Sequence, residues 1–427
     1  MSDLGLVVIA DDLTGANDCA VSYALAGCST ELLMDASDAS QWDPGSVDVT
    51  SVSSDSRSLG GLARARTRQL LDHAMERGAN SIFLKIDSTM RGSVSHQVTG
   101  ALDAWSRRHP DSVAVICPAY PALARTIEDG ILKVNGIEVT ETPSGRDPVC
   151  PVPSALMADL VPDAVGLENP GEATELARHI REASARQVII DAMSPHDVEV
   201  IAKAIMMLGD RAIPVGSAGL AKAMARSLPA ANVQPDQDPL PISGRVLVVV
   251  SSVHDVSQDQ VDAYIGGAQG GDAIVFSPHP AQLTSADALP TLRGQLRALV
   301  DSGPGNVIVR ANPSKLRDVH DREELAQRVA GQLAGLAADA LDHVPFGALV
   351  LVGGDGAAAT LAQMGVRKLR VLRAVAEGTP LGIVQETRFS GLPVVTKSGG
   401  FGGPGLLGEI ISLIQSGVPA QTEDSKE

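Results

Sequence analysis

The sequence predicts an α/β protein of two domains, each a mostly parallel sheet flanked by helices, with the active site in the cleft between them. The chain has 427 residues, which is too long for one ordinary domain. Short apolar runs alternate with longer amphipathic segments, as is typical of parallel strands covered by helices. Polar or glycine-rich stretches stand where the apolar runs end, and α/β sheets bind ligands beyond the carboxyl ends of their strands.

The first half of the chain shows this alternation clearly. Amphipathic segments such as 61–77 and 174–185 are predicted to be helices. Asn135-Gly136 lies between two alternating runs and predicts a β-hairpin instead. The predicted strands of this half are residues 6–10, 30–34, 81–86, 113–117, 187–191 and 213–215.

A second series of strands follows a predicted linker. Residues 228–244, LPAANVQPDQDPLPISG, are rich in Pro, Asp and Gln and lack periodicity. The strands expected after them lie in RVLVVVSS, DAIVFS, NVIVRAN, GALVLVGGDG and LPVVTKSGGFG. We therefore place one domain at 1–236 and the other at 237–420, and we expect a disordered tail at 421–427.

The composition argues against several classes of function. A formal net charge of −17 opposes binding to nucleic acid or to an anionic membrane, and aromatic residues make up only 2% of the chain. The four cysteines form no CxxC pair and have no metal-like spacing. No signal-like start and no apolar run of about 20 residues is present, so we expect a soluble, cytoplasmic protein. Assembly into a homo-oligomer stays open.

Charged and hydroxyl side chains follow four strands of the first half. Carboxylates accept hydrogen bonds from sugar hydroxyls, and arginine can clamp a substrate carboxylate through two bonds, so the mixture suits a small polyhydroxylated acid. Taken singly, each residue is equally well explained by a helix cap or a surface ion pair. The residues are Asp11, Asp12 and Thr14; Asp55, Ser56 and Arg57; Lys85, Asp87, Ser88, Thr89 and Arg91; and Arg125 and Thr126.

Glycine replaces charge at the strand ends of the second half. Glycines at a strand-to-helix turn let backbone N–H groups approach phosphate oxygens, although tight turns that need positive φ explain them too. No GxxxxGK[ST] sequence occurs, and the GxGxxG match at 400–405 lies too near the end of the chain for a dinucleotide fold. The candidates are Gly353, Gly354, Asp355 and Gly356; Gly399, Gly400, Gly402 and Gly403; Ser251 and Ser252; and, in the first half, Gly216, Ser217 and Gly219.

These two sets together indicate a kinase. Phosphoryl transfer from ATP to a hydroxyl needs both a pocket for a polar acid and loops that cradle phosphate. Three alternatives remain: a kinase of another small hydroxylated metabolite, a non-catalytic sugar-acid sensor, and a dehydrogenase, for which no proper fingerprint is present. A sensor would keep the first pocket but would not need phosphate-binding loops.

The chain resembles the four-carbon acid sugar kinases over residues 6–402. The motifs that carry the resemblance are IADDLTGANDCAV, KIDSTMRGSV, CPAYPALARTIEDGILKVNGIEV, VGSAGLA, GGDGAAATL and KSGGFG. The resemblance implies a sugar-acid domain, then a nucleotide domain, and ATP-dependent phosphorylation of D-threonate, D-erythronate or 3-oxo-tetronates at the 4-hydroxyl. It places Asp12, Lys85, Asp87, Ser88 and Arg91 in the substrate pocket and Ser252, Gly353, Gly354, Asp355, Gly356 and Gly400 in the ATP site.

Two positions depart from the family pattern. His254 stands where relatives have a hydroxyl in GSCSxxT, and Gly356 stands where many read GGDTA. Both departures bear on the nucleotide contacts. The region VNGIEVTETPSGRDPVCPVPSA looks closer to the threonate and erythronate members than to the 3-oxo-tetronate members.

The expected mechanism is a direct in-line transfer. Asp12 is our first choice for the carboxylate that accepts or orients the hydroxyl proton, and Asp87 is the second. Arg91, with Lys85, is expected to hold the substrate carboxylate, while glycine-loop amides and Mg²⁺ carry the triphosphate charge. The ligands of Mg²⁺ stay unassigned. The substrate set also includes Asp11, Arg57, Ser88, Arg125 and Thr126, and the nucleotide set comprises Gly216, Ser217, Ser252, His254, Gly353, Gly354, Asp355, Gly356, Gly399 and Gly400.

Overall fold

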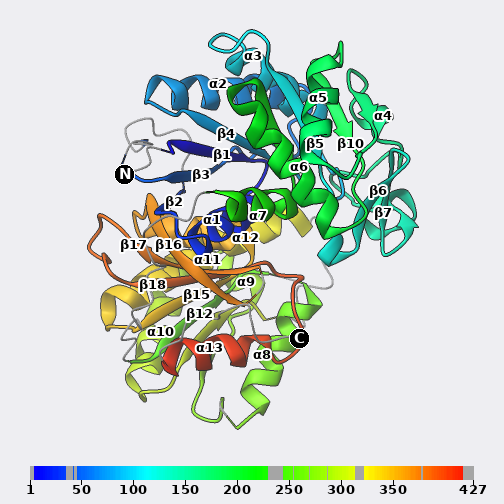
Figure 1. The fold of residues 1–427 in the computed structure, drawn as a ribbon. Helices are drawn as coiled ribbons and strands as arrows, with labels where there is room; N and C mark the ends of the chain where they lie inside the picture. The colour runs from blue at the N-terminus through cyan, green and yellow to red at the C-terminus, as the bar shows by residue number, and fades with distance from the viewer. Residues whose placement is uncertain are drawn as a thin grey trace. The chain divides into compact units, whose positions relative to one another are not determined.

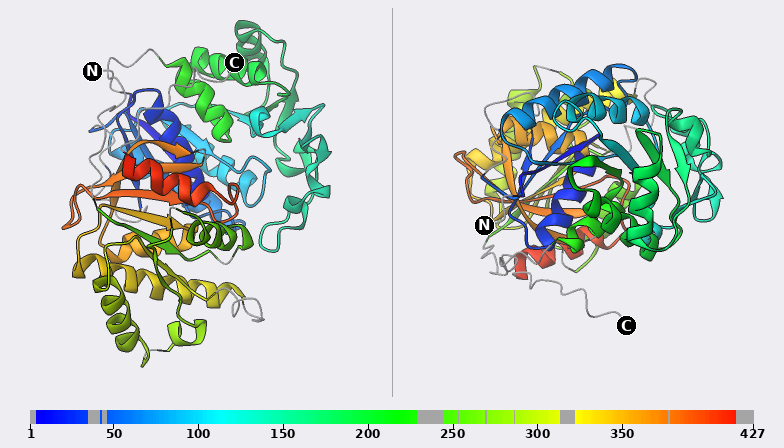
Figure 2. Two further views of the ribbon diagram at one scale, coloured as in Figure 1. Left: turned by 90° about the horizontal axis from the view of Figure 1, so that it is seen from below. Right: turned by 45° about the horizontal axis from the view of Figure 1, so that its top comes forward.

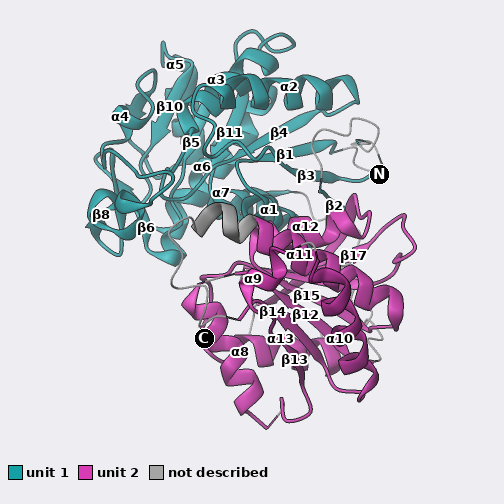
Figure 3. Cartoon of the chain, turned by 180° about the vertical axis from the view of Figure 1, so that it is seen from behind, with its two compact units in different colours: residues 1–235 teal, residues 236–427 magenta. Residues whose placement is uncertain are grey.

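The computed structural model divides the chain into two compact units, residues 1–235 and 236–427 (Figure 3). The residues that it describes are 4–34, 42, 46–228, 244–252, 254–268, 270–285, 287–312, 322–376 and 378–416, with backbone alone for 322–327. The predicted domain boundary and the predicted tail at 421–427 lie outside these residues, as does nearly all of the predicted linker.

Unit 1 alternates strands with helices from its start (Figure 1). Its main elements are β1 (Leu6–Ala10), α1 (Leu13–Leu25), β2 (Thr30–Leu33), β3 (Val49–Ser53), α2 (Leu62–Glu76), β4 (Ser81–Lys85), α3 (Val94–Trp105), β5 (Val113–Cys117), β9 (Val165–Leu167), α5 (Ala173–Glu182), β10 (Gln187–Ile190), α6 (Pro195–Leu208), β11 (Ala212–Gly216) and α7 (Ala218–Ser227). Between β5 and β9 lie β6 (Arg125–Glu128), β7 (Ile131–Val134), β8 (Ile137–Glu138), the short helix α4 (Met157–Leu160) and the 3₁₀ turns η3 (Val139–Glu141) and η4 (Pro143–Arg146).

The sheet of unit 1 reverses its strand order next to β1. The order is β2-β3-β1-β4-β11-β5-β10-β9, and all neighbouring strands run parallel. From β1 the chain goes to β2 and β3 on one side and then crosses back to β4 on the other. A crevice at the carboxyl edge is expected where the order reverses, because the connections of β1 and β4 leave in opposite directions. Ala10 and Lys85 face each other in register there.

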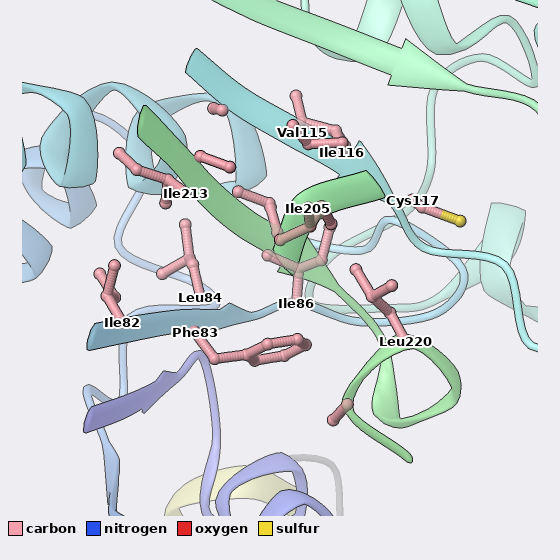
Figure 4. Close-up of a cluster of buried hydrophobic side chains, with 14 of the residues drawn as sticks. Ile82, Phe83, Leu84, Ile86, Val115, Ile116, Cys117, Ile205, Ile213 and Leu220 are labelled. Carbon is pink, nitrogen blue, oxygen red and sulfur yellow. The ribbon is translucent and has the colours of Figure 1, made fainter. Parts of the chain in front are cut away.

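Aliphatic residues fill both faces of this sheet. Strands buried on both sides read as continuous apolar runs, which is why LVVIA forms β1 with every residue buried. Figure 4 shows Leu84 and Phe83 pointing to opposite faces of β4, where they join residues of β5 and β11 such as Ile116 and Ile213. Helices α2 and α3 pack together on one face, and α1 and α7 pack together on the other (Figures 1 and 2).

The predicted β-hairpin is confirmed. Strands β6, β7 and β8 form a separate antiparallel sheet, and Asn135 and Gly136 connect the last two. Both residues have positive φ, 53° and 77°. A two-residue turn of this kind matches the twist of the strands that it joins, and Asn-Gly adopts it readily.

Unit 2 contains a second, mixed sheet. Its order is β13-β14-β12-β15-β18-β17-β16; the first five strands are parallel, whereas β17 is antiparallel to both of its neighbours. The elements are β12 (Val246–Val250), α8 (Asp255–Gly266), β13 (Ile274–Phe276), α9 (Pro280–Leu283), α10 (Leu289–Asp301), β14 (Val307–Arg310), α11 (Arg322–His343), β15 (Ala348–Val352), α12 (Gly354–Gln363), β16 (Lys368–Ala376), β17 (Thr379–Val384), β18 (Pro393–Lys397) and α13 (Leu406–Ser416).

Strand order reverses once in this unit too. From β12 the chain goes through β13 to β14 on one side and then to β15 on the other. The carboxyl ends of β12 and β15 therefore flank the second position where a ligand crevice is expected. The predicted class of fold, α/β with mostly parallel sheets flanked by helices, is thus confirmed for each unit. None of the described helices is long and apolar enough to cross a membrane.

Candidate active site

Asp11 and Asp12 stand at the carboxyl end of β1, where the strand order of unit 1 reverses. Asp12 caps α1, because its Oδ1 accepts a hydrogen bond from the backbone N–H of Gly15 at 2.7 Å. Asp11 is only 1% exposed, and its backbone N–H donates to the carbonyl of Lys85 on β4. The helix-cap explanation is therefore correct for Asp12, but it accounts for only one of its two carboxylate oxygens.

Arg57 gathers the carboxylates of two strand ends. Its Nε donates to Asp11 Oδ2 at 2.7 Å, and its Nη1 lies 2.9 Å from Asp12 Oδ2. Its Nη2 lies 4.0 Å from Asp87 Oδ1, beyond β4. Burial lowers the pKa of Arg57, but the charges of Asp12 and Asp11 outweigh burial and raise it, so the guanidinium stays charged. Burial, together with the charge of Asp12, raises the pKa of Asp11.

Asp87 is bound on both of its oxygens. Arg91 donates from Nε to Oδ2 at 2.9 Å and from Nη2 to Oδ1 at 3.1 Å, and the hydroxyl of Thr89 also donates to Oδ2. Burial alone would raise the pKa of Asp87, but the hydrogen bonds and charge of Arg91 and the charge of Arg57 together lower it. Asp87 is thus a fixed anion that organises the loop between β4 and α3.

Lys85 lies buried beneath this cluster. Its side chain passes close to Gly15, where a Cβ atom would stand 2.6 Å from Lys85 Nζ and 2.9 Å from Asp12 Oδ1. Gly15 is therefore needed for the lysine to reach the carboxylates. Burial lowers the pKa of Lys85, but the charges of Asp11 and Asp12 outweigh this effect and raise it.

The backbone around the cluster adopts conformations that most residues avoid. Asp55 and Met90 have φ of 48° and 62°, and Gly92 has φ of 88°. A Cβ atom on Gly92 would lie 2.4 Å from the carbonyl oxygen of Arg57. Positive φ at a residue other than glycine is a strained conformation that recurs at functional sites, and here Asp55 and Met90 adopt it on the arginine-bearing loops after β3 and β4.

Asp147 is a member of the cluster that the sequence did not reveal. Its Oδ2 lies 3.1 Å from Nη1 of Arg91, and its Oδ1 accepts hydrogen bonds from the backbone N–H groups of Val149 and Cys150. Burial raises the pKa of Asp147, but these two N–H groups and Arg91 outweigh burial and lower it. The thiol of Cys150 also lies 3.8 Å from the carbonyl oxygen of Arg57, so the segment after η4 reaches both arginine loops.

Other predicted substrate residues lie apart from the cluster or have no described contact with it. Arg125 begins β6 and donates from Nη1 to the carbonyl of Leu123 at 2.6 Å. Thr126 pairs in register with Lys133 on β7. Ser88 follows Asp87 on the loop after β4, and the structure describes no side-chain bond for it. Their assignment to the substrate pocket stays a prediction.

Gly216 and Ser217 lie in unit 1, at the end of β11. Gly216 is in register with Lys85, and a Cβ atom on it would lie 2.5 Å from the carbonyl oxygen of Cys117. Ser217 caps α7 by accepting from the N–H of Gly219, and its hydroxyl donates to a carbonyl at 3.0 Å. Close strand packing and helix capping account for both residues, and their predicted contact with a nucleotide stays a prediction.

In unit 2, the glycine-rich turn after β15 fits closely against the serines after β12. Gly353 has φ of 107°, and a Cβ atom on it would lie 2.6 Å from Ser251 Oγ. A Cβ atom on Gly356 would lie 2.0 Å from the same oxygen, which gives a packing reason for glycine at this position. Gly354 and Asp355 form the exposed first turn of α12.

A second glycine-rich turn follows β18 and is held by α8. A Cβ atom on Gly399 would lie 2.1 Å from Ser252 Oγ. Nε2 of Gln260, which carries two N–H donors, lies 2.9–3.1 Å from three consecutive carbonyl oxygens, those of Phe401, Gly402 and Gly403. The residues after β12, β15 and β18 thus form one contiguous edge, with the N-terminus of α12 beside it.

His254, which stands where the family pattern predicts a hydroxyl, is the N-cap residue of α8. It caps α8, because its Nδ1 accepts from the N–H of Val256 at 3.2 Å. Its Nε2 lies 3.3 Å from the position that a Cβ atom of Gly400 would take. His254 therefore lies after β12 and beside the glycine-rich turn that follows β18.

Lys397, the last residue of β18, is another member of the edge that sequence reasoning missed. It is 2% exposed, and its Nζ donates to the carbonyl of Ser398 at 2.8 Å. Burial lowers its pKa to about 8. The available signal was a charged residue directly after the apolar run PVVT.

Comparison with known proteins assigns both units. Residues 6–224 match the family model of a sugar-binding N-terminal domain, and residues 247–407 match that of a nucleotide-binding C-terminal domain. A D-threonate kinase of Bordetella bronchiseptica is 35% identical, over 92% of this chain and 94% of its own length. A D-erythronate kinase of Heliobacterium modesticaldum is 28% identical, over 92% of this chain and 93% of its own length.

The fold also matches a solved structure. A Haemophilus influenzae protein of 21% identity superposes with a TM-score of 0.76, covering 96% of this chain and 100% of its own. The charged edge of unit 1 lies within the sugar-binding match, and the glycine-rich edge of unit 2 lies within the nucleotide-binding match. The chain therefore belongs to the four-carbon acid sugar kinases, phosphotransferases that act on an alcohol group of a four-carbon sugar acid.

Proposed function

We propose that this enzyme transfers the terminal phosphate of ATP to the 4-hydroxyl of D-threonate, with D-erythronate as the next candidate substrate. The observation that carries the proposal is the pair of edges described above. A cluster of carboxylates and cations lies at the strand reversal of unit 1, and glycine-rich turns lie at the strand reversal of unit 2. The higher identity to the D-threonate kinase, 35% against 28%, favours threonate.

Asp12 is the carboxylate best suited to receive the hydroxyl proton. Its side chain is 28% exposed, whereas Asp11 and Asp87 are 1% and 11% exposed. Both oxygens of Asp87 are bound by Arg91, and its lowered pKa makes it a weak base. Both oxygens of Asp12 are bound too, Oδ1 by the N–H of Gly15 and Oδ2 by Nη1 of Arg57, but its side chain is the most exposed of the three. A general base must reach the proton that it accepts, and this exposure gives Asp12 the best access. This geometry favours Asp12 over Asp87.

Arg91, together with Lys85, holds the carboxylate of the substrate. Nη1 of Arg91 already donates a hydrogen bond to the carboxylate of Asp147, so this guanidinium is placed to bind a carboxylate. The cluster contains four carboxylates and three cations, so it has no excess positive charge to attract an anion. A substrate carboxylate would therefore take the place of Asp147 on Arg91. The groups counted are Asp11, Asp12, Asp87 and Asp147, with Arg57, Lys85 and Arg91.

The glycine-rich edge of unit 2 suits the phosphates of ATP. Backbone N–H groups at the start of α12 bind phosphate oxygens but not metal ions. Among the residues that the structure describes, no group of three or more His, Cys, Asp or Glu side chains could hold a metal. The residues present therefore fit a nucleotide whose own phosphates carry Mg²⁺, as is common for this ion. Bound there, Mg²⁺ would neutralise charge on the transferring phosphate. Transfer in a cleft between the domains stays a prediction.

A coupled assay of ADP release tests the proposal. The purified enzyme would be given ATP and Mg²⁺ with D-threonate, D-erythronate, 3-oxo-tetronates and neutral four-carbon polyols in turn. We expect the highest kcat/KM with D-threonate and little turnover of the polyols, since they lack the carboxylate for Arg91. Preference for a neutral polyol would contradict the proposal and favour a kinase of another metabolite. Tight binding of an acid with no ADP release would favour a sensor.

A further inference from the structure

Lys397 lies on the glycine-rich edge and is tied to the turn after β15. It stands in register with Val352, the last residue of β15, and its carbonyl accepts a hydrogen bond from the N–H of Gly353 at 2.9 Å. Because β15 and β18 are neighbours, the lysine lies one strand from the reversal between β12 and β15. Its backbone is thus part of the frame that shapes the phosphate-binding turn.

The side chain of Lys397 is buried without a counter-ion. Within the described part of the chain, no carboxylate oxygen lies within 4.0 Å of its Nζ, and the carbonyl of Ser398 is its hydrogen-bond partner. An ammonium has three N–H donors, and taking an unpaired charge out of water is costly. Burial accordingly lowers the pKa of Lys397 to about 8, so part of the population is neutral at slightly alkaline pH.

Arg310, a cation at the end of another strand of the same sheet, is paired with a carboxylate. It ends β14, and its Nη2 lies 2.8 Å from Oδ1 of Asp262, while Nη1 donates to Gln258 at 3.2 Å. Arg310 therefore has a carboxylate partner of its own. Lys397, in contrast, has no carboxylate partner among the described residues, so a bound anion can supply the missing negative charge.

We propose that Lys397 is a catalytic residue that binds the phosphates of the nucleotide and keeps its proton because they are bound. The inference rests on the proposed function, because it takes the ligand of unit 2 to be ATP or ADP. A phosphate at the glycine turns supplies the missing negative charge, which favours the ammonium form. Nucleotide binding is then linked to proton uptake by Lys397 at and above pH 8, and the affinity for nucleotide falls as the pH rises.

Calorimetric titration with ADP and Mg²⁺ tests this linkage directly. Titrations at pH 7, 8 and 9, each in two buffers of different ionisation enthalpy, give both the Kd and the number of protons taken up. For the wild-type enzyme we expect uptake of up to one proton at pH 9 and a Kd that rises about tenfold between pH 7 and 9, as follows from a pKa near 8. In Lys397→Met, the Kd for ADP at pH 7 should rise at least about tenfold because a charge-assisted contact is lost. The proton uptake on binding should vanish.

Two further variants make the result specific. Lys203→Met removes an exposed lysine from α6 in unit 1 and should leave the Kd and the proton uptake unchanged. Lys397→Arg keeps the positive charge at every pH of the experiment, so it should bind ADP without the pH dependence. If Lys397→Met does not fold, this variant alone tests whether Lys397 takes up the proton.

The inference is overturned if Lys397→Met binds ADP within twofold of the wild-type Kd, or if Lys397→Arg retains the wild-type pH dependence. Wild-type enzyme that binds neither ADP nor ATP would overturn the proposed function along with it. If the wild-type enzyme binds ADP and Lys397→Met binds it with the same Kd, the role of Lys397 alone is overturned.

Discussion

Arg91 holds both carboxylate oxygens of Asp87, with Nε 2.9 Å from Oδ2 and Nη2 3.1 Å from Oδ1. Removing one partner of a buried pair leaves the other charge uncompensated. We expect Asp87→Asn to lower the free energy of unfolding by about 3 kcal/mol near pH 7, measured by urea denaturation. Glu182→Gln, which breaks an exposed pair with Arg178, should cost about 0.5 kcal/mol or less.

The same pair predicts a pH dependence of stability. The pKa of Asp87 is lowered in the folded state, so its contribution is present above the unfolded value of about 3.9 and is lost as the pH falls through the folded value. The difference in free energy of unfolding between wild type and Asp87→Asn should therefore shrink as the pH falls from 5 toward 2. A constant difference over this range would show that the charge of Asp87 is not what stabilises the loop.

Asp12→Asn tests the proposed base. Asparagine caps a helix as well as aspartate does, so α1 should keep its N-cap while the hydroxyl loses its proton acceptor. We expect kcat to fall about 100-fold or more, with less than tenfold change in the Kd of the sugar acid measured by calorimetry. If kcat stayed within threefold of the wild-type value, Asp12 could not be the base.

Asp147→Asn should improve binding of the acid. With its negative charge removed, the side chain competes less well for Nη1 of Arg91, and the substrate carboxylate takes that position more readily. We expect the KM for the acid to fall about fivefold, equivalent to about 1 kcal/mol, with little change in kcat. Glu141→Gln, an exposed charge on η3, is the matched control and should leave KM unchanged. A large rise in KM would mean instead that Asp147 contacts the substrate.

Two glycines of one turn should respond oppositely to alanine. A Cβ atom on Gly356 would lie 2.0 Å from Ser251 Oγ, whereas one on Gly354 would meet no atom within 4 Å. Gly356→Ala should lower the free energy of unfolding by about 1–3 kcal/mol through overpacking, and Gly354→Ala should leave it unchanged or raise it by up to about 1 kcal/mol. Equal responses in denaturation experiments would refute the close fit between this turn and Ser251.

Much of the fold can be read from the sequence because the buried strands are continuous apolar runs. The predicted ranges 6–10 and 113–117 coincide with β1 and β5. Strand β3 was not predicted from its own residues, since VTSVS is short and half polar, and only the polar stretch after it attracted notice. Strands β16 and β17 were also missed, because an antiparallel hairpin interrupts the expected alternation of strand and helix.

The site was predictable only in part. Asp12, Lys85 and Asp87 follow apolar runs, and parallel strands bring their carboxyl ends to one edge, so the sequence indicates their proximity. Asp147 lies 56 positions from its partner Arg91 on an irregular segment, and no periodicity relates the two. The packing of the segment after η4 determines that contact, and it is visible only in three dimensions.

Gln260 gives the glycine-rich turn after β18 a property that glycines alone do not provide. Turns rich in glycine lose much conformational entropy when a ligand orders them. Here the two N–H donors of one amide group on α8 already lie within hydrogen-bond distance of three successive carbonyl oxygens, those of Phe401, Gly402 and Gly403. Part of the ordering of this turn is therefore built into the fold before any ligand arrives, and it comes from a helix residue that lies outside the turn.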